Sequence, residues 1–171
     1  MTLQERASRI QLVIMDVDGT LTDGAMYYGP QGEALKRFST RDGMGVTLLH
    51  KAGITTAIIT SEDTPIVTTR AAKLRVPHVY LGSHDKTATF HELSRHLSLS
   101  PESIAYIGDD VNDYHVMGLC GFAACPSDAV EAIKQRAHYI AAASGGNGAV
   151  REIAEIILQA QGKPCTLPEQ W

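Results

Sequence analysis

Short runs of apolar, often β-branched residues alternate along the chain with longer stretches in which apolar residues recur at helical spacing. The apolar runs predict strands at 11–17, 55–60, 78–82, 104–109 and, more weakly, 121–126. The stretches between and after them predict helices at 43–52, 65–74, 87–97, 112–119, 129–136 and 148–161. Alternating strands and helices indicate a parallel sheet with helices on its faces. The pattern therefore predicts an α/β fold, a Rossmann-like three-layer sandwich with a mostly parallel sheet.

One stretch interrupts this alternation. Residues 21–41 include the letters MYYGPQGEALKRFS, in which short extended segments flank Gly-Pro-Gln-Gly, and this predicts an inserted β-hairpin that forms a flap. The end of the chain, residues 162–171, contains two prolines and is expected to be an irregular tail. The segments on either side of Thr60 are too short to contain a separate cap domain. We therefore expect residues 1–171 to form one domain without a cap.

Composition and charge argue against several classes of partner. The formal net charge is −4 and no basic run is present, so nucleic acid is not an expected partner. No apolar stretch approaches the length of a membrane span, and the N-terminus has no apolar signal-like region, so we expect neither a membrane partner nor secretion. The three cysteines lack the CxxC spacing of zinc or redox sites and are typical of reduced thiols in a cytoplasmic protein.

Acidic, hydroxyl and basic side chains stand where the predicted strands end. In chain order these are Asp16 and Asp18, Thr60 and Ser61, Lys86, and Asp109 and Asp110. Ligands of open parallel sheets bind at the carboxyl ends of the strands, so these side chains are expected to converge on one edge. Crowded carboxylates repel one another, and a bound cation is the expected compensation.

The residue types fit phosphoryl transfer. Asp16 can attack as a nucleophile to form an aspartyl-phosphate, and Asp18 can serve as the general acid and base. Asp109 would complete an oxygen-only site for Mg²⁺, whose charge lets a carboxylate approach an anionic phosphate. Thr60 and Lys86 would hold the phosphoryl oxygens and stabilise the transition state. The sequence therefore predicts a Mg²⁺-dependent phosphomonoesterase.

These motifs, in this order, resemble those of the haloacid dehalogenase superfamily of phosphatases. DVDGT after the first strand, Thr60 after the second, Lys86, and GDDVND at 108–113 resemble its four signature motifs. The resemblance implies that Asp16 is the nucleophile and a metal ligand. It also implies that Asp18 is the acid/base and binds the metal through its backbone carbonyl.

The last of these motifs contains three aspartates. The resemblance implies that Asp109 is a metal ligand. Asp110 and Asp113 would then be supporting acids that orient Lys86 or the waters around the metal. An alternative, compatible with this role, is that they cap the helix that follows.

A closer resemblance links the chain to the 3-deoxy-manno-octulosonate 8-phosphate (KDO 8-phosphate) phosphatases, which lack a cap. The segments DVDGTLTDG, KRFSTRDGMG, GDDVNDYHVM and SGGNGAVREIAEIILQAQGK carry it. The resemblance implies an acidic sugar phosphate as substrate. It also implies a homotetramer in which hairpins and neighbouring tails narrow the entrance to each site. A surface ribbon and a frayed end are the alternatives for those two segments.

The resemblance further implies a set of substrate-binding residues. Arg41, Asp42 and Gly43 after the hairpin match substrate-contacting positions, and a plain Arg41–Asp42 salt bridge is the alternative. The other members of the expected set are Asp18, Thr60, Ser61, Glu62, Arg70, Lys73, Lys86 and Asn112.

One departure concerns substrate choice. The KDO 8-phosphate phosphatases carry Thr-Gly-Arg where this chain has Thr60-Ser61-Glu62, and a glutamate repels the carboxylate that an arginine would bind. The 2-keto-3-deoxy-nononate 9-phosphate (KDN 9-phosphate) phosphatases have a glutamate, an arginine and a lysine at the spacing of Glu62, Arg70 and Lys73. The last two can also be a solvated helix face. KDO 8-phosphate is the favoured substrate, and KDN 9-phosphate or N-acetylneuraminate 9-phosphate the alternative.

Other function classes fit the motifs less well. A signalling receiver domain combines similar residues but accepts phosphate on an aspartate after its third strand, whereas the DxD pair here follows the first. A silent relative that serves as a binding subunit would have no reason to retain the five candidate catalytic residues. A mutase is disfavoured because an aspartyl-phosphate open to water would be hydrolysed.

Overall fold

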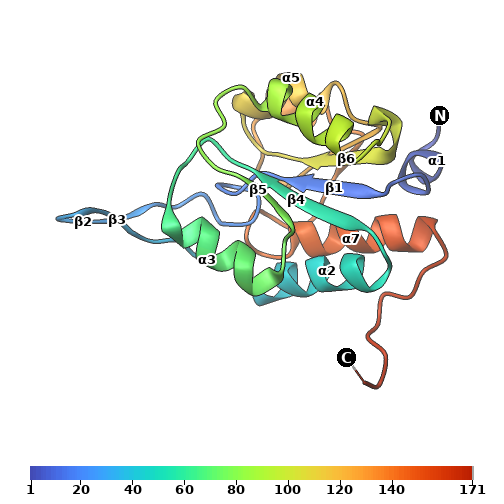
Figure 1. The fold of residues 1–171 in the computed structure, drawn as a ribbon, viewed down its shortest axis with the longest axis horizontal. Helices are drawn as coiled ribbons and strands as arrows, with labels where there is room; N and C mark the ends of the chain where they lie inside the picture. Colours follow the sequence, from blue (N-terminus) through green and yellow to red (C-terminus); the bar gives the residue numbers. More distant parts are fainter. Residues whose placement is uncertain (171) are drawn as a thin grey trace.

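The computed structural model describes residues 1–170, which form a three-layer sandwich of helices, sheet and helices (Figure 1). Within that range the main sheet has six parallel strands in the order β5-β4-β1-β6-β7-β8. In chain order they are β1 (Leu12–Met15), β4 (Thr55–Ile59), β5 (His78–Tyr80), β6 (Ile104–Ile107), β7 (Phe122–Cys125) and β8 (Tyr139–Ile140). The predicted α/β fold with a parallel sheet is confirmed.

Helices cover both faces of this sheet (Figure 1). The α-helices are α1 (Leu3–Ala7), α2 (Thr40–Lys51), α3 (Pro65–Leu74), α4 (Lys86–His96), α5 (Tyr114–Met117), α6 (Glu131–Lys134) and α7 (Ala149–Ala160). Two short 3₁₀ turns are η1 (Pro101–Ser103) and η2 (Val111–Asp113). None of the helices in the described chain combines the length and hydropathy that a membrane span requires.

Each face of the sheet carries its own hydrophobic core, because neighbouring residues of a strand point to opposite sides. Val13 and Met15 of β1 pack in the core that α2, α3 and α7 cover. Leu12 and Ile14 pack in the other, under α4 and α5. All four residues of β1 are buried, and β1 lies between β4 and β6. The carboxyl end of β1 is therefore fixed between two neighbouring strands.

The insertion after β1 is a small antiparallel ribbon of β2 (Tyr27–Gly29) and β3 (Gly32–Leu35). It projects beyond the body of the molecule (Figure 1) and exposes large apolar side chains, among them Tyr28 and Leu35. The predicted hairpin is present, with strands that occupy the middle of 21–41. No cap domain is present within residues 1–170.

Several element predictions need correction. The helix expected at 43–52 begins at Thr40, because the Ser39 hydroxyl accepts hydrogen bonds from the amides of Arg41 and Asp42 and so starts the helix earlier. The helix expected at 112–119 is η2 followed by the short α5, and that expected at 129–136 is only the four-residue α6. Neither α1 nor β8 was predicted.

The chain after α7 contains no helix or strand up to residue 170. The Lys163 ammonium donates to the carbonyl of Ala52 at 2.8 Å, and Cys165 and Leu167 pack against the core under α2 and α7. The predicted irregular tail is thus partly attached to the body, and Trp171 lies outside the described residues.

Candidate active site

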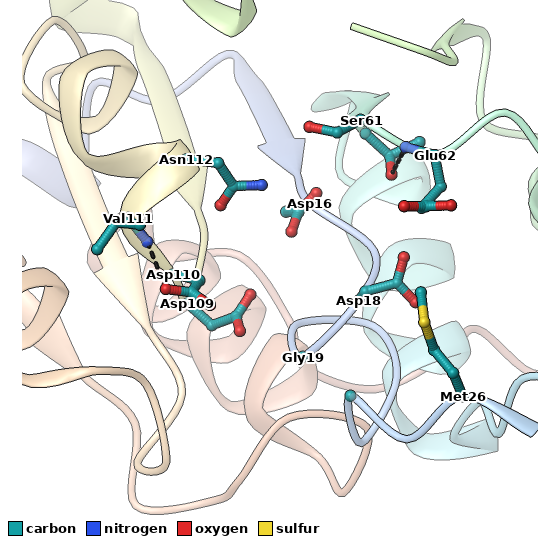
Figure 2. A pocket seen from close by; sticks show the side chains of 12 residues that line it. Asp16, Asp18, Gly19, Met26, Ser61, Glu62, Asp109, Asp110, Val111 and Asn112 are labelled. Carbon is teal, nitrogen blue, oxygen red and sulfur yellow. Dashed lines mark hydrogen bonds between the residues drawn. The ribbon is translucent and has the colours of Figure 1, made fainter. Parts of the chain in front are cut away.

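A cavity of about 360 Å³ opens at the carboxyl ends of β1, β4 and β6 (Figure 2). Its floor is fixed by the sheet, because the amide of Asp16 donates to the carbonyl of Ile107 at 2.9 Å and that of Thr60 to Tyr80 at 3.0 Å. The cavity is lined by Asp16, Asp18, Gly19, Gly24, Met26, Thr60, Ser61, Glu62, Asp109, Asp110, Val111 and Asn112. The structure therefore brings most of the predicted site residues to one edge of the sheet.

Beneath this cavity, Lys86 at the start of α4 joins two carboxylates. Its Nζ donates to Oδ1 of Asp16 at 2.8 Å and to Oδ1 of Asp113 at 2.7 Å. Lys86 is only 3 % exposed, and a buried charge is tolerated when opposite charges and hydrogen bonds surround it. An ammonium has three protons to donate, so one remains for a phosphoryl oxygen.

Asp113 is fully buried and all its contacts are internal. Besides Lys86, Oδ1 accepts a hydrogen bond from the Tyr106 hydroxyl at 2.8 Å, and Oδ2 accepts one from the amide of Asp109 at 3.0 Å. Asp113 thus orients Lys86 and the start of the Asp109 loop at once. Its two oxygens are already used, which leaves Asp16 and Asp109 as the carboxylates free to bind a metal.

The electrostatics of the cluster favour a bound cation. Burial and the charge of Asp113 raise the pKa of Asp16 to about 8, although Lys86 acts in the opposite direction. Burial and Asp113 also raise the pKa of Asp109 to about 7. Oxygens of the three aspartates lie within 4.8 Å of one another. Asp16 and Asp109 thus offer carboxylate oxygens close together, and an all-oxygen donor set of this kind fits Mg²⁺.

The loop after β1 is shaped by one glycine. Gly19 has φ +86°, a left-handed conformation that glycine adopts without strain, and a Cβ there would lie 2.0 Å from Oδ2 of Asp109. The hydroxyl of Thr20 donates to Oδ1 of Asp109 at 3.1 Å. The hydroxyl of Thr22 accepts from the amides of Gly19 and Gly24 at 3.2 and 3.1 Å. The loop therefore closes tightly around the Asp109 carboxylate.

Asp18 lies on the other side of Asp16 from Asp109, beside Met26 (Figure 2). Its Oδ1 accepts a hydrogen bond from the ammonium of Lys36 at 2.5 Å. Its Oδ2 is buried and has no hydrogen-bond partner among the described residues. Lys36 also forms an ion pair with Glu33 of β3 at 2.7 Å.

The opposite wall carries polar groups around Thr60. Its buried hydroxyl accepts a hydrogen bond from the amide of Glu62 at 3.2 Å. Ser61 and Glu62 line the rim on this side, and Asn112 lines it on the other (Figure 2). Asp110 accepts a hydrogen bond from the amide of Val111 at 2.7 Å, so it caps the turn that follows β6.

Besides Lys86, which lies beneath the cavity, five members of the predicted substrate-binding set do not line it: Arg41, Asp42, Gly43, Arg70 and Lys73. Asp42 is buried and accepts hydrogen bonds from the amides of Gly148 and Arg151, at 3.2 and 3.0 Å, which caps α7. An Arg41–Asp42 salt bridge is not formed within residues 1–170. Gly43 is buried against Arg70.

Arg70 and Lys73 line a separate, apolar groove with Leu35 and Phe38. The Arg70 guanidinium donates to the carbonyl of Ser39 at 2.9 Å and lies 5.3 Å from the centre of the Phe38 ring. Arg70 and Lys73 therefore line this groove and not the cavity that contains Asp16.

Sequence reasoning missed three residues whose side chains donate hydrogen bonds to the aspartates of the site. Tyr106 lies within the apolar run of β6, and nothing in that run indicates that its hydroxyl donates a hydrogen bond to Asp113. Thr20 reads as an ordinary turn residue. Lys36 reads as a surface charge on a hairpin. The signal for all three lies in the folded arrangement and not in local sequence.

Comparison with known proteins agrees with this geometry. Residues 54–153 match the family model of haloacid dehalogenase-like hydrolases. A 3-deoxy-D-manno-octulosonate 8-phosphate phosphatase of Yersinia pestis is 44 % identical over 159 residues, which cover 93 % of this chain and 85 % of the relative. The chain belongs to this family of phosphatases. The corresponding enzyme of Escherichia coli K12 is 42 % identical over 158 residues, covering 92 % of this chain and 84 % of the relative.

Solved structures of KDO 8-phosphate phosphatases share the fold along nearly the whole chain. The Yersinia pestis crystal structure has a TM-score of 0.92 at 43 % identity and covers 94 % of this chain and 87 % of its own. The Moraxella catarrhalis enzyme, solved with a magnesium ion, a phosphate ion and a KDO molecule, has a TM-score of 0.91 at 38 % identity, with coverage of 94 % and 92 %. The predicted family and phosphatase class are confirmed, and a receiver-like or silent role is disfavoured.

Proposed function

We propose that this phosphatase hydrolyses 3-deoxy-D-manno-octulosonate 8-phosphate to KDO and inorganic phosphate, with Mg²⁺ as cofactor. The observation that carries the proposal is the Asp16–Lys86–Asp113 arrangement beside Asp109, at the base of an open cavity. It occurs in a chain whose relatives, named for this reaction, are more than 40 % identical over most of its length. The reaction would place the protein in the synthesis of a lipopolysaccharide sugar.

In the first step, the free carboxylate oxygen of Asp16 attacks phosphorus and the bond from phosphorus to the sugar oxygen breaks. Asp18 gives its proton to that leaving oxygen. Thr60 and the third proton of Lys86 hold the phosphoryl oxygens. In the second step, Asp18 removes a proton from a water that attacks phosphorus, which releases phosphate and restores Asp16.

Asp16, Asp109 and the backbone carbonyl of Asp18 would hold the Mg²⁺. When bound, it supplies positive charge that offsets repulsion between the Asp16 carboxylate and the phosphate. The raised pKa values of Asp16 and Asp109 support this assignment.

Glu62 supports a second candidate for the substrate. It lines the rim of the cavity, where a glutamate accepts hydrogen bonds from sugar hydroxyls but repels a carboxylate. This supports KDN 9-phosphate or N-acetylneuraminate 9-phosphate as the alternative substrate. Arg70 and Lys73, which face another groove, would then have to serve the cavity of a neighbouring subunit.

We further propose a homotetramer that acts in the cytoplasm. The exposed apolar side chains of the hairpin, Met26, Tyr27, Tyr28 and Leu35, support assembly. Free thiols at Cys120, Cys125 and Cys165 support a reducing compartment. Sedimentation analysis tests the assembly, and a monomer would contradict it.

The substrate proposal is tested by steady-state kinetics on KDO 8-phosphate, KDN 9-phosphate and N-acetylneuraminate 9-phosphate, with Mg²⁺ and with a chelator. We expect the highest kcat/KM for KDO 8-phosphate, and loss of activity on chelation. A preference for a nine-carbon acid would make Glu62 a specificity residue. No hydrolysis of any of the three would contradict the proposal.

A further inference from the structure

Lys36, the residue that follows β3, is buried, although lysine is among the residues least often found inside a protein. Its side chain is 0 % exposed, whereas the apolar Leu35 before it is 64 % exposed. Burial of an apolar side chain such as leucine normally stabilises the fold, whereas lysine side chains are normally exposed to water. The charged end of Lys36 must therefore be held inside by specific partners.

Those partners are two carboxylates from different parts of the chain. Oδ1 of Asp18, in the loop after β1, lies 2.5 Å from the Lys36 ammonium, and Oε1 of Glu33, in β3, lies 2.7 Å from it. The first contact joins the hairpin to the loop that carries the acid/base. The second stays within the hairpin. Of the two, only Asp18 accepts a hydrogen bond from the ammonium, whereas Oε1 of Glu33 lies close without one, so it is the carboxylate of Asp18 that Lys36 fixes in orientation.

Asp18 itself lines the cavity, and its two oxygens have different surroundings. Oδ1 is held by the Lys36 ammonium, whereas Oδ2 is buried and has no hydrogen-bond partner among residues 1–170. The ion pair with Lys36 is therefore the contact that fixes how the carboxyl group of Asp18 faces the cavity.

We propose that Lys36 is a positioning residue for the reaction: through its ion pair with Oδ1 it holds the carboxyl group of Asp18 at the cavity, where the leaving alcohol and the attacking water exchange protons with it. This inference rests on the acid/base role proposed for Asp18. Lys36 does not reach the substrate, because its side chain is enclosed. The hairpin thus contributes to catalysis in the active site of its own chain.

The test compares two substrates that differ in their need for an acid. The alkoxide released from KDO 8-phosphate requires a proton, whereas p-nitrophenyl phosphate releases a stable phenolate that does not. Lys36→Met is expected to lower kcat/KM for KDO 8-phosphate, which reports the step that releases the alcohol, by roughly 10- to 100-fold, a part of what general acid catalysis supplies. The kcat/KM for p-nitrophenyl phosphate should change little, because its leaving group needs no acid. Lys36→Arg, which retains a charged donor, should recover part of the loss.

Matched variants separate positioning from structure. Lys51→Met removes an exposed lysine of α2 and should leave both activities unchanged. Glu33→Gln removes only the contact within the hairpin and should cost less than Lys36→Met. In an Asp18→Asn background, the added Lys36→Met change should have no further effect on the residual rate. If Lys36→Met does not fold, as judged by circular dichroism, Lys36→Gln is measured in its place.

An equal loss of kcat/KM on both substrates, or a further loss in the Asp18→Asn background, would overturn the inference and leave the proposed function intact. A wild-type enzyme that hydrolyses neither substrate would overturn the proposed function itself. A large rise in KM for KDO 8-phosphate with kcat retained would show a binding role for Lys36, which also contradicts the inference.

Discussion

Replacing Lys86 by methionine removes the one ammonium that joins Asp16 to Asp113, at 2.8 and 2.7 Å. Methionine keeps the length of the side chain but leaves two buried carboxylates without that cation. Loss of one partner from a buried ion pair costs about 3–5 kcal/mol. For a chain of this size, that corresponds to a fall in Tm of about 6–20 °C. Hydrolysis should be lost as well, because Lys86 also holds the phosphoryl group.

The loss of stability should depend on pH. The pKa of Asp16 in the folded protein is about 8, above ~3.9 for an unfolded aspartate. A group whose pKa is raised by folding binds more protons in the folded state, so its contribution to stability falls as pH rises through that interval. Removing Lys86 raises this pKa further. The Tm of Lys86→Met, relative to wild type, should therefore be lowered more at pH 8 than at pH 5.

Differential scanning calorimetry in metal-free buffer at both pH values measures this effect. Lys51→Met, an exposed lysine on α2, serves as the control and should change Tm by no more than a degree or two at either pH. The reasoning is refuted if Lys86→Met melts with the wild type at pH 8, or if its loss is the same at pH 5.

Three further predictions follow from the same cluster. Asp16→Asn should abolish hydrolysis yet raise Tm at pH 8, because a buried carboxylate with a raised pKa is removed; an active variant would contradict the nucleophile assignment. Affinity for Mg²⁺, measured by calorimetry, should rise between pH 6 and 8, because the pKa values of Asp109 and Asp16 are about 7 and about 8 and the metal binds their deprotonated forms. The rise should reach up to about tenfold per pH unit for each proton released. A flat profile would exclude deprotonation of these two residues on binding. Gly19→Ala should weaken Mg²⁺ binding and turnover together, because its Cβ would lie 2.0 Å from Oδ2 of Asp109; normal binding would show that the loop relaxes.

The sheet and the acidic cluster were predictable because their signals are local. Each central strand is an apolar run that ends in a polar residue, and parallel strands bring those ends together without further information. Asp16, Thr60 and Asp109 could be placed on one edge for that reason. The two-residue β8 and the five-residue α1 are too short to give a periodic signal.

The remainder depends on contacts between distant segments. Asp42, which was expected among the substrate-binding residues, lies beneath α7 and accepts hydrogen bonds from the amides of Gly148 and Arg151. Lys36 sits between exposed Leu35 and Arg37, and nothing in that stretch indicates that its ammonium is buried against Asp18. Such ion pairs join residues far apart in the chain, so only the folded structure shows them.

The most direct test of the account is to trap the phosphorylated enzyme. KDO 8-phosphate and Mg²⁺ are mixed with the protein, the reaction is stopped in acid within milliseconds, and peptides are analysed by mass spectrometry. The account predicts a transient phosphate on the peptide that contains Asp16 (Leu12–Gly19 in its sequence) and none in Asp16→Asn. Release of phosphate with no phosphorylated peptide, or with the phosphate on another residue, would contradict it.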